Sequence, residues 1–260
     1  MDPNENIIEL DALQTGDILL CIGEGDLASR VTAVTGSKYT HAAICYSPTE
    51  VVDIGDRVQK SSAEQFIKQF KYVAAFRNPF IWNDERQESL CRFLDAKVNS
   101  DTVYDVRAAL SLDRRATDHQ MTLFAKLTEH FTSGFPAAAH DKTKYICSEL
   151  VIAALIAVGF WDEAMAIAYQ GDTIHPGKMG HDSTFGFKVG YLRADSATVI
   201  PADDEFLCSM TNSMTFATRQ ATQKQMSEEA PLETGEVLSP EEVHALTEGG
   251  RYFQIEALSE

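Results

Sequence analysis

Hydrophobic and polar positions along the first 200 residues form short apolar runs and longer stretches with helical periodicity. The short runs, bounded by Gly, Pro, Ser and Asn, predict β-strands. These strands cover residues 17–22, 40–46, 51–54, 72–77, 187–192 and 198–200. The second and third runs are joined by Ser47-Pro48-Thr49-Glu50, a turn that predicts an antiparallel hairpin.

Helical periodicity predicts helices over residues 27–34, 61–70, 83–98, 118–131 and 147–158. The last of these is almost entirely apolar, so we expect it to be central and buried. In the helix over 118–131, we expect the apolar positions to face the core; they are Met121, Phe124, Ala125 and Leu127. Antiparallel strands beside clustered helices are typical of an α+β fold rather than of a parallel, doubly wound sheet.

Composition changes near Pro201. From Ala202 to Glu260 there are 12 Asp and Glu residues against three Lys and Arg, a net charge of −9. This stretch is also rich in Ser, Thr and Gln, which is typical of a linker or tail. We therefore predict a folded domain over residues 1–200 and an acidic extension over residues 201–260. The extension is expected to be partly flexible, with a short helix that begins at Ser239-Pro240.

The whole-chain composition narrows the class of protein. The 260 residues are 44% hydrophobic and 23% charged, which is ordinary for a globular protein and excludes a disordered chain or a coiled-coil rod. The net charge of −17 argues against nucleic acid as a partner, because phosphate binding needs clustered Lys and Arg. It argues equally against a polybasic membrane anchor.

The beginning of the chain is acidic and has neither the basic region nor the apolar core of a Sec signal peptide. The longest apolar run, residues 150–160, is about half the length needed to cross a bilayer. We expect no transmembrane segment and a chain that is cytoplasmic as synthesised. Export by a signal-peptide-independent secretion system is the alternative.

The five cysteines are widely spaced and include no CxxC pair. This pattern supports neither a disulfide framework nor a zinc site, so we expect no metal and no other cofactor. Cys21, Cys45 and Cys91 lie on apolar faces, so we expect them in the core. Cys208 falls in the acidic extension and is interpreted as a free thiol.

Cys147 has a different setting, at the start of the most apolar helix. Free N–H groups and a partial positive charge at a helix N-terminus favour a thiolate and can stabilise an oxyanion. Position alone, however, fits an inert structural cysteine better.

His41 opens the strand over 40–46 and shares a face with Ala43 and Cys45. The hairpin brings Asp53, on the next strand, beside it, close enough for a carboxylate to orient the imidazole. Glu50 and Asp56 are alternative orienting acids. Both positions also have a purely structural interpretation. His41 would then be an ordinary histidine at a strand end, and Asp53 an exposed acid on an edge strand.

Five further positions carry weaker signals. Asp17 follows the turn at Gly16 and is expected to hold the first strand in place. Tyr104-Asp105 fits either the lining of a cleft or the packing of a helix. His175 and His181 flank a glycine-containing loop and match no zinc spacing, so we interpret them as loop histidines.

Taken together, these elements resemble the NlpC-like branch of papain-fold cysteine hydrolases in its circularly permuted form, as in YiiX-like proteins. The resemblance covers roughly residues 13–160. Its order is the permuted one, since His41 precedes Cys147 by 106 residues. The matching elements are Thr15-Gly16-Asp17-Ile18-Leu19-Leu20, Thr40-His41, Val51-Val52-Asp53, Tyr104-Asp105 and Tyr145-Ile146-Cys147-Ser148-Glu149-Leu150.

The resemblance implies an antiparallel sheet packed against a central helix that bears the cysteine, with a helical insertion. It implies Cys147 as nucleophile and His41 as base. Asp53 would be the orienting residue; the lecithin–retinol acyltransferase-like cousins have a histidine at the same distance from the base. Asp in place of Glu or His departs from the family pattern.

The implied function is a metal-independent cysteine hydrolase that cleaves an amide, such as a cell-wall or other peptide, through a thioester. One alternative is hydrolysis or transfer of a lipid acyl group. This is disfavoured because the acidic sequence shows no obvious apolar or basic membrane face. Another is a non-enzymatic binding module on the same fold. A bacterial effector whose extension docks a secretion or immunity partner is a further hypothesis.

Overall fold

The computed structural model describes residues 6–134, 136–137 and 139–207. Its centre is a six-stranded sheet in the order β4-β3-β2-β1-β5-β8, in which every neighbouring pair is antiparallel. The fold is therefore α+β, as the sequence predicts. The strands are β1 (Ile18–Cys21), β2 (His41–Ser47), β3 (Glu50–Ile54), β4 (Val58–Ser62), β5 (Tyr72–Arg77) and β8 (Phe187–Arg193).

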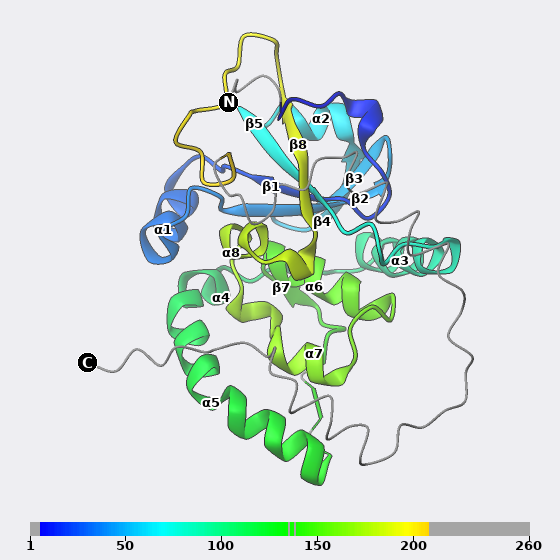
Figure 1. Ribbon diagram of the computed structural model, residues 1–260, viewed down its shortest axis with the longest axis vertical. Coiled ribbons are helices and arrows are strands. Elements are labelled where there is room, and N and C mark those ends of the chain that lie inside the picture. Colours follow the sequence, from blue (N-terminus) through cyan, green and yellow to red (C-terminus); the bar gives the residue numbers. More distant parts are fainter. Residues whose placement is uncertain (1–5, 135, 138, 208–260) are drawn as a thin grey trace, which may run out of the picture. The chain divides into compact units, whose positions relative to one another are not determined.

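Alternation along the strands divides the core into two clusters, one on each face of the sheet. In β1, Ile18 and Leu20 face one cluster, and Leu19 and Cys21 face the other. The first cluster includes the helices α3 (Asp84–Val98), α6 (Cys147–Ala157) and α8 (Pro176–His181). The second is covered by α2 (Ala63–Ile67), and Figure 1 shows α2 and α6 on opposite sides of the sheet.

The predicted apolar helix is the central one. In α6, all residues from Cys147 to Leu155 are buried, and Gly159 follows the helix with a positive φ of 69°. The remaining helical elements are α1 (Asp26–Thr35), α4 (Val106–Leu110), α5 (Leu112–Ser133), α7 (Glu163–Ala168) and the short 3-10 turns η2 (Leu10–Ala12), η3 (Gly171–Thr173) and η4 (Ser183–Phe185). Among the described residues, no helix combines the length and the apolar character that crossing a bilayer requires.

The orientation expected for the helix over 118–131 is wrong. Met121 is 72% exposed and Phe124 is 83% exposed. The inner face of α5 is mostly polar: Arg115 pairs with Asp172, and the His119 Nε2 atom lies 3.1 Å from the Ala168 carbonyl oxygen. These polar contacts, rather than burial of the apolar stripe, fix the helix against the rest of the fold.

Two elements of the sheet also differ from expectation. Residues 198–200 form no strand, although Ile200 is buried. A strand that the sequence pattern missed, β4, pairs with β3 at the edge of the sheet. Its pattern is mostly polar because only one edge and one face are covered.

The boundary expected after residue 200 falls too early. Phe206 is 2% exposed and belongs to the first core cluster, and Asp204 is 2% exposed. The folded body therefore extends at least to Leu207. Cys208 and the helix predicted from Ser239 lie outside the described residues.

Candidate active site

His41 and Asp53 lie side by side on neighbouring strands. The hairpin of β2 and β3 brings the two side chains onto the same face, and His41 Nε2 lies 3.0 Å from Asp53 Oδ2. The Asp53 side chain is 5% exposed and the His41 side chain is 18% exposed. Asp53 is thus a buried acid paired with a half-buried imidazole, the arrangement expected from the hairpin.

Cys147 reaches this pair from the opposite layer. It is the first residue of α6, and the helix packs across β2. The Cys147 thiol donates to the carbonyl oxygen of Thr40 at 3.7 Å and lies close enough to His41 to raise the pKa of the imidazole. Because Asp53 occupies Nε2 of the ring, Nδ1 is the nitrogen left for a second partner.

Electrostatics favour a charged imidazole at this position. Burial alone lowers the pKa of His41, but hydrogen bonds and negative charge from Asp53 and Cys147 raise it to about 10. A carboxylate that bonds to one nitrogen of an imidazole strengthens the ring as a base toward a thiol on its other side.

The other buried cysteines lack such support. Burial raises the pKa of both the Cys21 and the Cys45 thiols well above the ordinary value. Both are 0% exposed on the face covered by α2, so they are core residues, as expected. Cys91 is only partly buried; its thiol donates to the Tyr46 carbonyl oxygen at 3.7 Å.

Tyr104 is the site residue whose role the sequence left open. It lies in β6 (Val103–Tyr104), which pairs in parallel with β7 (Lys144–Tyr145), directly before Cys147. Burial raises the pKa of Tyr104, and the charge of Cys147 and a hydrogen bond to it raise it further. The hydroxyl is therefore held protonated beside the sulfur. Asp105, next in sequence, accepts from the N–H of Ala108 and caps α4.

A groove of about 580 Å³ opens beside these residues, between α1, the ends of β2 and β3, and the start of α4. His41, Asp53 and Tyr104 line it, whereas Cys147 lies beneath them and is 3% exposed. Within the described residues the lining contains no Lys or Arg. It contains two further carboxylates, Glu24 and Asp56, and the apolar side chains of Leu27, Ala28, Val31, Ile54, Phe70 and Val106.

The other candidates from the sequence have structural surroundings. Asp17 accepts from Gln14 N–H and from two nitrogens of Arg77, and so ties β1 to β5, as expected. His175 caps α8 by accepting from the N–H of Lys178. His181 lies at the other end of α8, 3.6 Å from Glu205. Within the described part of the chain, Asp53 is the acid bonded to His41, rather than Glu50 or Asp56.

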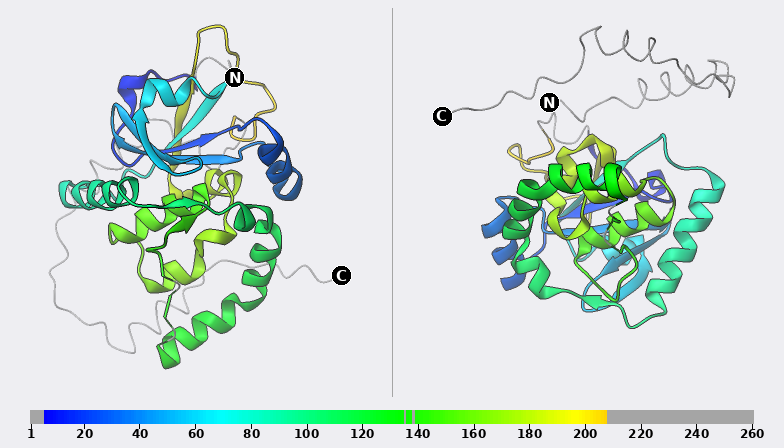
Figure 2. Two further views of the ribbon diagram at one scale, coloured as in Figure 1. Left: turned by 180° about the vertical axis from the view of Figure 1, so that it is seen from behind. Right: turned by 90° about the horizontal axis from the view of Figure 1, so that it is seen from below.

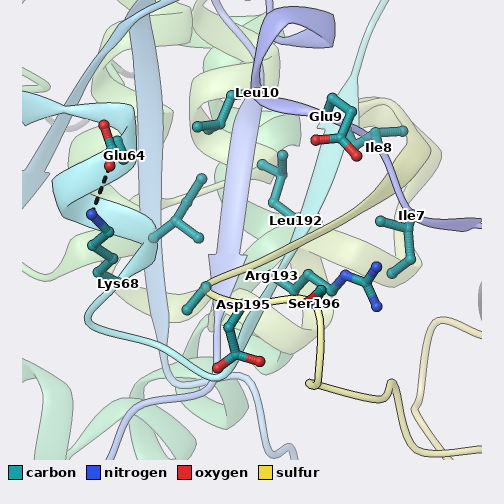
Figure 3. Close-up of a pocket in the computed structure, with 12 residues that line it drawn as sticks. Ile7, Ile8, Glu9, Leu10, Glu64, Lys68, Leu192, Arg193, Asp195 and Ser196 are labelled. Atoms are coloured by element: carbon teal, nitrogen blue, oxygen red, sulfur yellow. Dashed lines mark hydrogen bonds and ion pairs between the residues drawn. The ribbon is translucent and has the colours of Figure 1, made fainter.

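A separate hollow of about 350 Å³ lies on the far side of α2, between residues 7–10 and the end of β8. Figure 3 shows that its charged side chains include Glu64 and Lys68, which are paired with each other. Among the described residues that line it, there is neither a cysteine nor a histidine. Across residues 6–134, 136–137 and 139–207, no three His, Cys, Asp or Glu side chains are grouped to hold a metal ion.

Comparison with known proteins gives distant likeness to solved structures alone. No family model matches the chain, and no curated protein matches it. Among solved structures, the chain is similar to the metalloprotein YiiX from Escherichia coli O157:H7, described as DUF1105. The TM-score is 0.38 at 17% identity, over 56% of this chain and 67% of that one. A likeness this distant carries no information about chemistry.

Proposed function

We propose that this protein is a cysteine hydrolase in which Cys147 is the nucleophile, His41 the base and Asp53 the residue that orients the base. The observation that carries the proposal is the contact of one imidazole with both partners. Asp53 lies 3.0 Å from Nε2, and Cys147 is close enough to the same ring to shift its pKa. The permuted papain-like, NlpC-like fold suggested by the order of these residues belongs to the same proposal.

The reaction follows from this geometry. His41 takes the thiol proton, and the Cys147 sulfur attacks a carbonyl carbon to form a tetrahedral oxyanion. Collapse breaks the bond to the leaving group, which takes the proton from His41, and leaves a thioester on Cys147. His41 then takes a proton from water, the hydroxide attacks the thioester, and the acid leaves as the thiol is restored.

The proposal includes two donors for the oxyanion. One is the backbone N–H of Cys147, in the first turn of α6, where N–H groups have no acceptor within the helix. The other is the hydroxyl of Tyr104, held beside the sulfur by β6. A protonated hydroxyl close to the sulfur is well placed to bond to an oxygen on the attacked carbon.

Charge in the groove favours an amide substrate without phosphate groups. Glu24, Asp53 and Asp56 line the groove, and the described lining holds no Lys or Arg to bind an anionic headgroup. A peptide amide or isopeptide with a neutral or positively charged flank meets no such repulsion. We therefore take amide hydrolysis as the leading activity.

One observation favours the alternative, hydrolysis or transfer of a lipid acyl group. Leu27 and Val106, both in the groove lining, are 37% and 48% exposed, so part of the groove surface is apolar. Val34 on α1 and Leu110 on α4 add to this surface, and the two helices contact each other. Such an apolar surface can bind the acyl chain of a lipid.

The test is to trap the acyl-enzyme. The full chain is incubated in parallel with peptidoglycan fragments, activated peptide amides and neutral and anionic acyl lipids, and its intact mass is measured. An acyl adduct on Cys147 in a peptide arm supports amide hydrolysis, and one in a lipid arm supports the alternative. Cys147→Ala should abolish the adduct, and His41→Ala should slow its formation severely without unfolding the protein. An adduct that persists in Cys147→Ala would assign the chemistry to another residue.

A further inference from the structure

The segment over residues 203–206, which we call the C-terminal clip, joins the start of β2 to the far edge of the sheet. Residues 37–39, the loop that leads into Thr40 and His41, contact it through three successive positions. We propose that the clip is a positioning element for the nucleophile and base, holding this loop so that Thr40 and His41 face Cys147. The inference rests on the proposed function.

Glu205 makes the most direct contacts with the loop. Both of its carboxylate oxygens accept from the Ser37 hydroxyl, at 2.9 and 3.0 Å. The backbone N–H of Lys38 donates to Oε1 at 2.7 Å. The Ser37 hydroxyl oxygen in turn accepts from the backbone N–H of Tyr39 at 3.0 Å. One side chain therefore organises three consecutive residues of the loop.

Asp204 ties the same loop to the sheet. Its Oδ2 accepts from the hydroxyls of Tyr39 and Tyr72, each at 2.9 Å, and its Oδ1 accepts from the hydroxyl of Tyr191 at 2.5 Å. Tyr72 lies in β5 and Tyr191 in β8, so the carboxylate joins the loop to two strands on the far side of β1. All three tyrosines are nearly or fully buried, which makes each of these bonds costly to break.

The clip itself is fixed to the body. Phe206 packs against the rings of Tyr39 and Phe76, with ring centroids 4.4 and 5.1 Å apart. Its carbonyl oxygen accepts from the buried ammonium of Lys188, on β8, at 2.7 Å. Because the clip is held in the core of the body, it can fix the position of the loop that it binds.

The loop leads directly into the site. Thr40, next after Tyr39, is the residue whose carbonyl accepts the Cys147 thiol, and its hydroxyl accepts from the N–H of Gly23. Helix α8 closes the other side, since a Cβ at Gly177 would lie 2.1 Å from the Ser37 hydroxyl oxygen. The loop therefore has no free space toward α8, and its place is set by the clip.

Two matched pairs of variants test the inference in the full chain. Tyr39→Phe and Tyr72→Phe each remove one hydroxyl at 2.9 Å from the same oxygen, but only Tyr39 belongs to the loop. Glu205→Ala removes the loop contacts and the 3.6 Å contact with His181. Asp203→Ala removes an ion pair with Lys38 in which the two side chains are 53% and 78% exposed. Glu205→Gln retains an acceptor for the Lys38 N–H and should restore most of the loss.

The readout is the rate of Cys147 alkylation by iodoacetamide against pH, mapped to the peptide that contains it, with the melting temperature measured alongside. We expect Tyr39→Phe and Glu205→Ala to lower the rate near neutral pH by about tenfold. Tyr72→Phe and Asp203→Ala should keep the wild-type pH profile, although Tyr72→Phe lowers the melting temperature. A purely structural clip would lower melting temperatures and leave every profile unchanged.

The two levels of the proposal fail differently. Suppose that wild-type Cys147 is alkylated faster at neutral pH than an ordinary thiol, and that Tyr39→Phe and Glu205→Ala have the same pH profile. The clip then has no positioning role, and the Cys147–His41 pair stands. If wild-type Cys147 reacts like an ordinary thiol, with an inflection near about pH 8.5, the pair itself is wrong and this inference falls with it.

Discussion

His41 is held by two partners whose charges act in the same direction. Asp53 is nearly buried, and its Oδ1 has no hydrogen-bond partner among the described residues, so its directional contact is the one from Oδ2 to the ring. The sequence predicted this pair because a tight hairpin fixes which residues of two strands lie opposite each other. A buried acid with one bond is tolerated where it orients a base.

The pair makes a prediction about pH. The raised pKa of His41, about 10 against 6.5 for an ordinary histidine, contributes stability that is fully present below about pH 6.5 and lost as pH rises through about 10. Asp53→Asn removes the charge that supports the imidazolium. The wild type should exceed this variant in free energy of unfolding by about 1–2 kcal/mol near pH 6, with the difference shrinking toward pH 10. Urea unfolding at both values measures it, and a difference that grows with pH would contradict the assignment.

Tyr104 shows where residue-level reasoning from the sequence stops. Its contact with Cys147 depends on the parallel pairing of β6 with β7, in which Tyr104 lies opposite Tyr145. No local pattern reveals a two-residue pairing between segments so far apart in the chain. The sequence therefore could not distinguish a Tyr104 that lines a cleft from one that packs a helix.

Substitution of this hydroxyl provides the next test. Tyr104→Phe should lower kcat by about 100-fold with little change in KM, because an oxyanion donor acts in the transition state. Tyr145→Phe is the matched control: its hydroxyl donates to the His140 carbonyl and accepts from the Lys142 N–H, away from the sulfur. This control should lose stability and keep kcat. Equal kcat in the two variants would remove Tyr104 from the oxyanion site.

At the scale of elements, strands and the central helix are more predictable than helices at the periphery. Apolar runs located β1, β2, β3, β5, β8 and α6, because these elements are buried and their pattern reports burial directly. Helix α5 has an apolar stripe and a polar face that forms ion pairs and hydrogen bonds with α7 and η3. Periodicity shows that a helix has an apolar face and a polar face. It does not show which of the two faces packs against the rest of the protein.

The orientation of α5 can be tested with single substitutions. Because the Phe124 side chain is largely exposed, Phe124→Ser should change the free energy of unfolding by no more than about 0.5 kcal/mol. Leu112→Ser, on the buried face of the same helix, should cost about 2–5 kcal/mol. Thermal or urea unfolding of the two variants distinguishes the faces, and the reverse order of stabilities would restore the inward orientation that the sequence suggested.

At the scale of the whole molecule, the described residues form one body built around two layers that meet at the site. His41 and Asp53 come from the sheet, and Cys147 and Tyr104 come from the segments packed beneath it. The two views in Figure 2 show the sheet and this helical layer stacked on each other. Composition placed the end of the body at residue 200 because the residues that follow are acidic, but three of those acids bind the loop before His41.

The position of this boundary gives the last prediction, which compares a chain ending at Leu207 with one ending at Ile200. The shorter chain loses Phe206, whose burial alone accounts for about 3–5 kcal/mol, and leaves the hydroxyls of Tyr39, Tyr72 and Tyr191 without Asp204. Each unsatisfied buried hydroxyl adds about 1–3 kcal/mol, so the total approaches the whole stability of a typical domain, about 5–15 kcal/mol. We expect the chain ending at Leu207 to melt cooperatively with Cys147 still reactive, and the chain ending at Ile200 to be unfolded or to melt far lower. Circular dichroism melting and thiol labelling of both chains measure this, and equal melting temperatures would show that the clip contributes nothing to the body.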